Sequence, residues 1–333
     1  MGVDVPPRLT ARRATAITVA LSLLLSLLLV IRISSQTAWV RVSLDASHGP
    51  IFAGAALLLA MLLRPTRVAA AGTPWPDWRL YGKVLLLCIA LGAAIEFLQG
   101  FEGRPPSLFD VLTDTAGALV GLTVWSLAGR RRADPGRRPT GTPLWTVIAL
   151  GLAGLAFVLW RPLHTAAAYA HRSAIFPSIA EFSVPLDLFF AEMRGAGTRV
   201  VELPAPWSRQ PGERALELRY DSAHPPALQV VEPSGDWQGY GVFAADITNA
   251  GQAELWLVLR ILDLRHDWSH ADRFNLPLLI PPQTRITVRV ALEAVAAAPA
   301  ARRMDMARIA NVMLFGRHTG ASGTLYVSRL WLE

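Results

Sequence analysis

A series of long apolar segments in the first 163 residues constrains the fold of this chain more than any other feature. The first segment, residues 14–33, has no charged residue before Arg32. About twenty such residues in a helix cross the roughly 30 Å hydrocarbon core of a bilayer. The segment is longer than the roughly 7–15 apolar residues of a signal peptide, so we expect an uncleaved membrane span.

Four further spans are expected, which agrees with a chain that is 52% hydrophobic and 17% charged. The second is short: it begins near His48, ends at Arg64 and has Pro50 and Pro65 near its ends. The expected domains are an N-terminal tail (1–13), a four-span region (14–130), an arginine-rich loop (131–142), a fifth span (143–163), a linker (164–180) and a second domain (181–333).

The distribution of lysine and arginine predicts the orientation of these spans. Three precede the first span, four lie between the second and third, and five lie between the fourth and fifth. Because cytoplasmic loops carry an excess of these residues, we expect a protein of the bacterial cytoplasmic membrane with its N-terminus inside and everything after Trp160 outside. The net charge of +7 comes from this half of the chain, so it does not indicate nucleic-acid binding.

On this topology, six polar residues lie near one face of the membrane. Ionisable groups at membrane depth are costly and usually face a bundle interior or water, which favours a common site. Gly117 and Gly121 continue the helical stripe of the aspartates and would let a neighbouring helix approach closely. Solvated residues at span ends are the alternative interpretation. The six are His48, Glu96, Gln99, Arg104, Asp110 and Asp114.

The order of these residues resembles the VanZ-like family of small multi-span membrane proteins, over roughly residues 14–130. One departure is Asp114, which stands where the family pattern usually has asparagine. The family is named after a teicoplanin-resistance protein, so the resemblance implies a role in glycopeptide resistance or in the handling of envelope polysaccharide.

Two kinds of chemistry are open for the polar cluster. As an enzyme, it would use carboxylates as acid and base, with His48, Glu96, Asp110 and Asp114 as candidates. As a binding site, it would use Gln99 and Arg104, the arginine holding a phosphate or pyrophosphate. We find no nucleophile motif, glycine-rich phosphate loop or metal-ligand spacing, and the lone Cys88 excludes a disulfide within the chain.

After residue 180, the pattern of apolar residues becomes typical of strands. Eight runs rich in Val, Leu, Ile and aromatic residues are separated by Pro, Gly, Asn and Asp, which predicts an all-β sandwich. Residues 182–193 and 302–313 are ambiguous. The runs are 198–203, 215–220, 227–232, 241–249, 253–263, 284–292, 309–315 and 324–333.

Residues 235–249, GDWQGYGVFAADITN, and the closing run GTLYVSRLWL resemble the galactose-binding-like jelly roll of many carbohydrate-binding modules. The resemblance covers about residues 180–333 and implies sugar binding. That fold often holds a structural calcium and has an acid in its closing strand. Ser328 stands in that strand here, so we expect no metal and no cofactor.

Sugar binding needs aromatic faces for stacking and polar groups for the hydroxyls. Packing at a strand corner is the alternative for Tyr240, as for Trp237, and we expect Trp256 to face the core. The sequence HDWSH could also be read as a set of metal ligands. The binding candidates are Trp207, Tyr240 and Trp268, with Asp263, Asp267, His270, Asp272 and Arg273 in a charged loop.

Three functions follow from these patterns. The first is a membrane protein that recognises or acts on envelope glycan or lipid-linked glycan, with the bilayer and the glycan as its partners. The second is a membrane hydrolase or transferase that uses Glu96 and Asp110 on a lipid-linked substrate. The third is a scaffold whose β domain docks a protein of the envelope.

Overall fold

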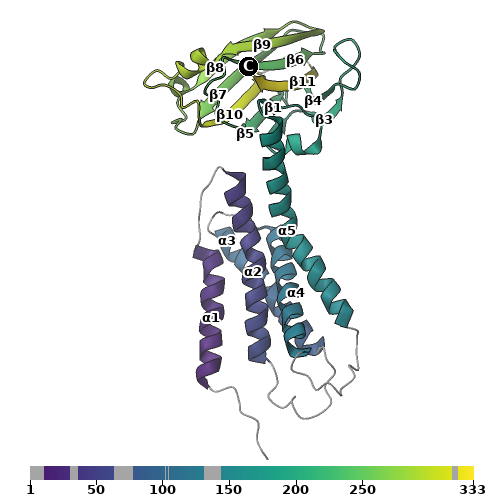
Figure 1. Ribbon diagram of the computed structural model, residues 1–333, viewed down its shortest axis with the longest axis vertical. Coiled ribbons are helices and arrows are strands. Elements are labelled where there is room, and N and C mark those ends of the chain that lie inside the picture. The colour runs from purple at the N-terminus through teal and green to yellow at the C-terminus, as the bar shows by residue number, and fades with distance from the viewer. Residues whose placement is uncertain are drawn as a thin grey trace, which may run out of the picture. The chain divides into compact units, whose positions relative to one another are not determined.

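The computed structural model of this protein forms two compact units, residues 1–165 and residues 166–333 (Figure 1). The boundary between them falls inside a long helix. The structure describes residues 11–30, 37–63, 78–101, 103, 105–130, 144–316 and 322–333.

The first unit is helical. Four of its described helices are long and apolar enough to cross a membrane by length and composition, and the described apolar part of the remaining one, Ala14–Leu24, is shorter. The helical membrane region expected from the sequence is therefore confirmed. The helices are α1 (Ala11–Val30), α2 (Ala38–Leu63), α3 (Trp78–Phe101), α4 (Leu108–Arg130) and α5 (Leu144–Ile175).

Two boundaries differ from those expected. Helix α2 begins at Ala38 rather than near His48, and Pro50 lies inside it. Proline is tolerated in a membrane helix because neighbouring helices and local adjustments satisfy the freed backbone groups. Helix α5 continues to Ile175, so most of the expected linker is helical. That segment is rich in alanine, the residue with the highest helix propensity.

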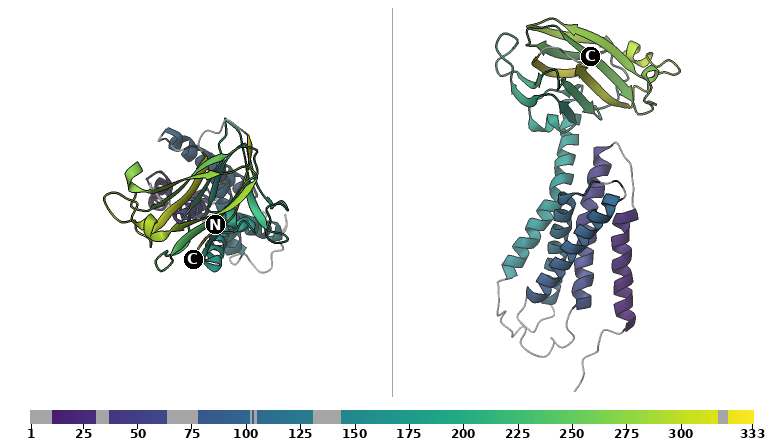
Figure 2. Two further views of the ribbon diagram at one scale, coloured as in Figure 1. Left: turned by 90° about the horizontal axis from the view of Figure 1, so that it is seen from above. Right: turned by 180° about the vertical axis from the view of Figure 1, so that it is seen from behind.

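Helices α2 and α4 lie side by side in contact (Figures 1 and 2). A Cβ atom on Gly117 would lie 2.1 Å from the carbonyl oxygen of Gly49, and one on Gly121 would lie 2.3 Å from that of Ala53. No side chain fits at either position, so glycine is what allows this close approach. The close packing expected from the glycine stripe is thus present.

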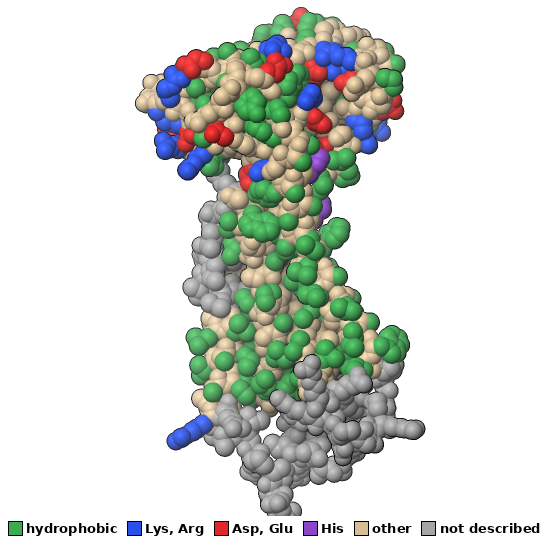
Figure 3. All heavy atoms as spheres, in the orientation of Figure 1, with side chains coloured by type: hydrophobic (Ala, Val, Ile, Leu, Met, Phe, Trp, Pro, Cys, Tyr) green, Lys and Arg blue, Asp and Glu red, His purple; other side chains and the backbone are tan. Residues whose placement is uncertain are grey.

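In the helical unit, large apolar side chains lie on the surface and several polar side chains lie in the interior, which is the reverse of a water-soluble bundle. Large apolar side chains such as Leu86, Phe97 and Trp145 are 66–69% exposed. His48, Glu96 and Asp114 are buried. On the face drawn in Figure 3, hydrophobic side chains cover the helical unit, whereas charged side chains gather on the β unit. This distribution suits helices that face lipid.

The second unit is an antiparallel β sandwich. One sheet has the strand order β3 (Gly197–Glu202), β4 (Arg214–Tyr220), β11 (Gly323–Leu332), β6 (Val242–Asn249) and β9 (Thr284–Ala291), with β1 (Ser178–Ala180) paired to β11. The other has the order β2 (Ala191–Arg194), β5 (Ala227–Val231), β10 (Ile309–Gly316), β7 (Leu255–Asp263) and β8 (Phe274–Ile280). Short helical segments are η1 (Pro185–Leu188), η2 (His270–Asp272) and α6 (Leu292–Ala296).

The eight runs expected as strands correspond to β3, β4, β5, β6, β7, β9, β10 and β11, which confirms the sandwich. The sequence pattern missed β1, β2 and β8. Strand β8, FNLPLLI, contains Pro277, and proline argues against a strand unless the strand is at an edge. Strand β8 is an edge strand of the five-stranded sheet, so its proline costs little there.

The core between the two sheets contains the aromatic pair at the start of β6. Trp237 is 1% exposed, and its ring stacks on Phe243 with 5.8 Å between the ring centroids. Its indole N–H donates to the carbonyl oxygen of Ser234 at 3.2 Å. The packing role considered for Trp237 is therefore correct.

The contact between α2 and α4 leads to the first prediction. Gly121→Ala should lower the free energy of unfolding by about 1–3 kcal/mol, because the new methyl group would overlap the backbone of Ala53. The measurement is thermal unfolding of the full chain in detergent.

Gly82→Ala, in α3, is the matched control. A Cβ atom at Gly82 meets nothing within 4 Å, so this change should be neutral or stabilising by up to about 1 kcal/mol. Equal effects of the two substitutions would contradict the close packing at Gly121.

Candidate functional site

The interior of the helical unit contains a buried contact between a histidine and an aspartate. Nδ1 of His48, in α2, lies 2.9 Å from Oδ1 of Asp114, in α4. The Asp114 side chain has no exposed surface, whereas the imidazole of His48 keeps 10%. The structure therefore brings together two residues that are 66 positions apart in the chain. A carboxylate that holds one imidazole nitrogen orients the ring and can share a proton with it.

Helix α3 completes this contact through a glycine. A Cβ atom on Gly92 would lie 2.5 Å from Oδ2 of Asp114, so no side chain fits between α3 and this carboxylate. Oδ2 is buried and accepts no hydrogen bond from the residues that the structure describes. The departure of Asp114 from the asparagine of the family pattern thus places an acid at the most buried point of the cluster.

Glu96, in α3, lies beside the N-terminal end of α4, where Asp110 is located. The acid–base role that was considered for these two carboxylates stays a prediction. The backbone N–H of Ser107 donates to Oε2 of Glu96 at 2.6 Å. The hydroxyl oxygen of Ser107 in turn accepts the N–H of Asp110 at 3.2 Å, which caps the helix. A carboxylate at a helix N-terminus is favourable, so Glu96 has a structural role here in addition to any chemical one.

Of the two remaining members of the predicted cluster, the structure describes Gln99 but not Arg104. Gln99 is 5% exposed and lies on the buried face of α3 with Glu96, as its spacing predicted. Arg104 lies outside the described residues. The role in phosphate binding that was considered for Arg104 stays a prediction.

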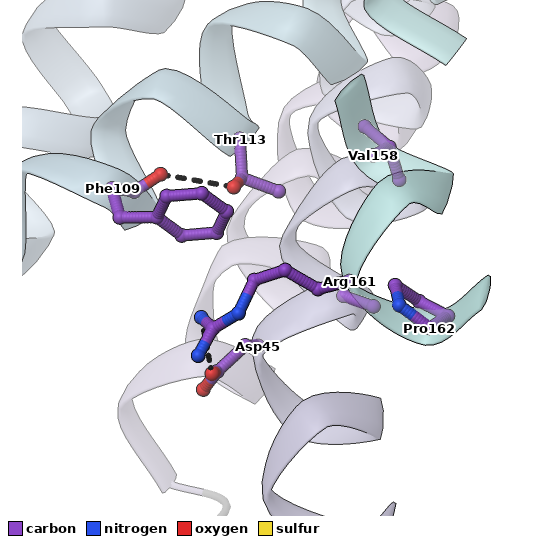
Figure 4. A pocket seen from close by; sticks show the side chains of 7 residues that line it. Asp45, Phe109, Thr113, Val158, Arg161 and Pro162 are labelled. Atoms are coloured by element: carbon purple, nitrogen blue, oxygen red, sulfur yellow. Dashed lines mark hydrogen bonds and ion pairs between the residues drawn. The ribbon is translucent and has the colours of Figure 1, made fainter. Parts of the chain in front are cut away.

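An ion pair that the sequence did not predict links α2 and α5. Nη1 of Arg161 donates to Oδ2 of Asp45 at 2.9 Å, and the guanidinium lies 4.7 Å from the ring centroid of Phe109 (Figure 4). The cavity beside this pair has a volume of about 10 Å³, which is the size of a single water molecule. Because a glycan or a lipid headgroup cannot enter it, we assign this contact to helix packing.

In the β unit, two of the predicted binding aspartates belong to a salt-bridge network. Both carboxylate oxygens of Asp263, the last residue of β7, accept hydrogen bonds from Arg302 at 2.6 and 2.8 Å. Arg302 also donates from Nε and Nη2 to Asp272 at 2.7 and 3.0 Å. The network closes the loop between β7 and β8, so Asp263 and Asp272 hold the loop rather than present free carboxylates.

The network changes the pKa of Asp263. Burial of this carboxylate by itself raises the pKa, but the hydrogen bonds from Arg302 and from the backbone N–H of Asp305 outweigh burial. The pKa of Asp263 is therefore lower than its ordinary value of 3.8. Hydrogen bonds from Arg302 also lower the pKa of Asp272.

The remaining loop residues are more exposed. Trp268 is 70% exposed at φ +69°, a conformation that is strained for a bulky residue, and its ring contacts that of His266 with 4.4 Å between the ring centroids. Oδ1 of Asp267 accepts the N–H of Ser269 at 2.8 Å. His270 is exposed. Within the described ranges, no group of three His, Cys, Asp or Glu residues is placed to hold a metal.

Trp207 and Tyr240 lie away from this loop and take part in packing. The indole N–H of Trp207 donates to the carbonyl oxygen of Gln283 at 3.3 Å, and its ring lies 6.0 Å from that of Tyr326. The ring of Tyr240 meets that of Phe176 edge to face at 5.4 Å. The neighbours of these two rings differ from those of Trp268, and the binding role of the three aromatic residues stays a prediction.

The outward face of the five-stranded sheet carries a group of residues that the sequence reasoning missed. We call it the sheet face. Along β7, Leu255, Leu257, Leu259 and Ile261 pack into the core, so the alternate residues point outward. Trp256 is accordingly 52% exposed, and the expectation that it faces the core was wrong. The sheet face comprises Glu192, Arg194, Gln229, Trp256, Val258, Arg260, Asn275, Leu279, Asn311, Met313 and Phe315.

Polar and aromatic groups alternate across the sheet face. Nε of Arg260 donates to Oδ1 of Asn275 at 2.9 Å, and its guanidinium lies 4.6 Å from the ring centroid of Phe315. The amide nitrogen of Gln229 donates to Oδ1 of Asn311 at 3.0 Å. Gln229, Met313, Arg260 and Asn275 form one row across four strands, about 14 Å long at the usual strand spacing.

The contact between His48 and Asp114 leads to a prediction about stability. Asp114→Ala should lower the free energy of unfolding of the full chain in detergent by about 1–3 kcal/mol, because Nδ1 of His48 would stay buried without its partner. Asp114→Asn keeps a hydrogen-bonding group of nearly the same shape and should cost less. Thermal unfolding measures both, and equal losses would show that the hydrogen bond contributes little.

The loop network leads to a third prediction. Arg302→Ala removes the partner of the buried Asp263 and should lower the free energy of unfolding by about 3 kcal/mol. The adjacent Arg303 pairs with Glu293 through side chains that are 63% and 75% exposed, so Arg303→Ala should cost less than about 1 kcal/mol. Chemical denaturation followed by tryptophan fluorescence measures the difference.

The pH dependence of the free energy of unfolding, measured for the wild type and Arg302→Ala, tests whether the charge pair with Asp263 causes the difference. Because folding lowers the pKa of Asp263, the stabilisation is present above its ordinary value of 3.8 and is lost as the pH falls through the lowered pKa. The difference between the wild type and Arg302→Ala should therefore shrink below about pH 4. A difference that stays constant down to pH 2 would rule out this charge pair as its source.

Comparisons with known proteins find similarities in both parts of the chain. No curated protein matches the chain. Among similar solved structures, an exo-beta-agarase is 16% identical with a TM-score of 0.35, and the match covers 45% of this chain but 23% of the agarase. The family 11 carbohydrate-binding module from Clostridium thermocellum is 14% identical with a TM-score of 0.33, over 46% of this chain and 93% of the module.

A third similar structure is the CBM28 carbohydrate-binding module specific for non-crystalline cellulose. It is 12% identical with a TM-score of 0.33, over 48% of this chain and 93% of the module. The family model VanZ/LLP1 matches residues 16–129, which include His48, Glu96 and Asp114. Residues 16–129 therefore form a VanZ-like domain.

Proposed function

We propose that this protein is a multi-span protein of the bacterial cytoplasmic membrane that binds cell-envelope glycan through the sheet face of its β unit. The observation that carries the proposal is the exposed Trp256 on the same face as the stacked Arg260 and Phe315. Aromatic faces pack against the apolar C–H surface of sugar rings, and side-chain amides bond the hydroxyl groups.

The composition of the sheet face supports a polar, ring-shaped ligand over a protein partner. It carries the amides of Gln229, Asn275 and Asn311 among the apolar residues. Protein interfaces exclude water from a core that is largely apolar, and such a core would leave several of these amide groups without partners. Sugar hydroxyls, which both donate and accept, satisfy amides and guanidinium groups together.

The location at the envelope rests on the arginine and lysine pattern of the connections. The N-terminal tail and the two connections richest in these residues alternate with connections that are poor in them, which supports an N-terminus in the cytoplasm and residues after α5 outside it. The VanZ-like domain would then hold the β unit at the outer surface of the membrane. There it meets envelope glycan or the sugar part of lipid-linked glycan.

Binding measurements on the full chain in lipid nanodiscs test the proposal. With a panel of immobilised envelope glycans, Trp256→Ala should weaken binding about tenfold or more, because it removes a stacking surface. Trp268→Ala is the matched control, since Trp268 is also exposed but lies on the loop between β7 and β8. Analysis of the bound glycan by mass spectrometry shows whether it leaves unchanged or as a product of hydrolysis or transfer.

The possible outcomes of the binding experiment distinguish the sheet face from the loop, and a glycan-binding protein from a scaffold or an enzyme. Loss of binding in Trp268→Ala with normal binding in Trp256→Ala would contradict the sheet face and favour the loop. Absence of binding to every glycan, together with capture of one stoichiometric envelope protein, would contradict the proposal and favour a scaffold. Release of a cleaved or transferred glycan would favour an enzyme.

A further inference from the structure

Two arginines of the β unit lie close together, and neither forms an ion pair with a carboxylate that the structure describes. Arg260, in β7, is half-buried and forms its side-chain contacts with Asn275 and Phe315. Arg273 precedes β8 in extended backbone, at φ −158° and ψ 158°. Because Phe274 packs on the core, alternation along the strand puts Arg273 on the outward side with Asn275. Both arginines therefore belong to the sheet face.

The environment of Arg260 is unfavourable to positive charge, and Arg273 has an unpaired donor. Nε of Arg273 is buried and donates no hydrogen bond to any residue that the structure describes. Burial, together with the positive charge of Arg273, lowers the pKa of Arg260 below its ordinary value. An anion bound between the two guanidinium groups would offset their repulsion and would accept a hydrogen bond from Nε of Arg273.

Other arginines of the β unit have their positive charge neutralised by two carboxylates each. Arg285 pairs with both Glu213 and Asp246, and Arg302 pairs with both Asp263 and Asp272. The carboxylate nearest to Arg273 in sequence, that of Asp272, is thus already taken by Arg302. Within the described part of the β unit, no carboxylate is recorded in an ion pair with Arg260 or Arg273.

We propose that Arg260 and Arg273 bind an oxyanion carried by a sugar residue, so that the ligand of the sheet face is an acidic glycan. The inference rests on the proposed function and adds the chemical class of the ligand to it. A guanidinium group presents two parallel N–H donors that match a carboxylate or a phosphate. Phe315 beneath Arg260 and Trp256 on the same strand as Arg260 supply apolar surface for the sugar rings.

Paired ligands that differ only in charge test this class. The full chain in zwitterionic nanodiscs is titrated with oligogalacturonate and with the same oligomer after its carboxyl groups have been reduced to alcohols. The acidic oligomer should bind at least tenfold more tightly, and its affinity should fall as salt is raised. A glycan phosphate ester, compared with its dephosphorylated form, distinguishes phosphate from carboxylate as the source of the oxyanion.

Variants connect the charge preference to the two arginines. Arg260→Gln and Arg273→Gln should each weaken binding of the acidic ligand about tenfold and leave binding of the neutral counterpart within about twofold. Arg214→Gln is the control, because Arg214 is exposed on β4 of the other sheet. Thermal unfolding of each variant confirms that the fold is kept.

The outcomes separate this inference from the proposed function. If neutral and acidic glycans bind equally and the two arginine variants behave as the wild type does, the inference is overturned while glycan binding stands. If the acidic ligands bind but Arg214→Gln loses affinity as much as Arg260→Gln does, the two arginines are not the site. If neither charged nor neutral glycans bind, the proposed function fails together with the inference.

Discussion

The close approach of α2 and α4 is the contact on which the helical unit depends. Gly117 and Gly121 leave no room for a Cβ atom against the backbone of α2, so the two helices meet backbone to backbone. Only at such a distance can the short side chain of Asp114 reach the imidazole of His48. The glycine stripe and the buried polar contact are therefore two parts of one arrangement: the first sets the spacing, and the second gives the two helices a specific register.

The two units differ in the hydrogen-bond partners that they give to a buried aspartate. In the helical unit, Asp114 is fully buried with one histidine partner, and the apolar surface faces outward. In the β unit, Asp263 is also fully buried, but Arg302 satisfies both of its oxygens. A carboxylate with two charge-assisted hydrogen bonds is suited to holding a loop, whereas one with a single neutral or protonated partner is suited to exchanging a proton.

Much of the architecture could be predicted from residue patterns, and the errors have identifiable causes. Apolar length and lysine–arginine spacing indicated the helical region, and alternation with turn residues indicated eight strands. The alternation of side chains along β7 could also be predicted from the sequence, but it shows only that Trp256 and Leu257 point to opposite sides of the sheet. Which side is the core depends on the second sheet. The prediction therefore placed Trp256 in the core, although it lies on the surface.

By itself, the sequence determined the membrane helices, the sandwich class, the close packing at Gly117 and Gly121, and the presence of polar residues near the ends of α3 and α4. These follow from length, periodicity and residue size, which are local properties. The tertiary structure decided which polar residues meet. It paired His48 with Asp114, used Glu96 at the start of α4, and put Arg260 and Arg273 together on the sheet face with no carboxylate among the described residues in an ion pair with either. Side-chain partners are separated by tens of residues, and only packing brings them within hydrogen-bond distance.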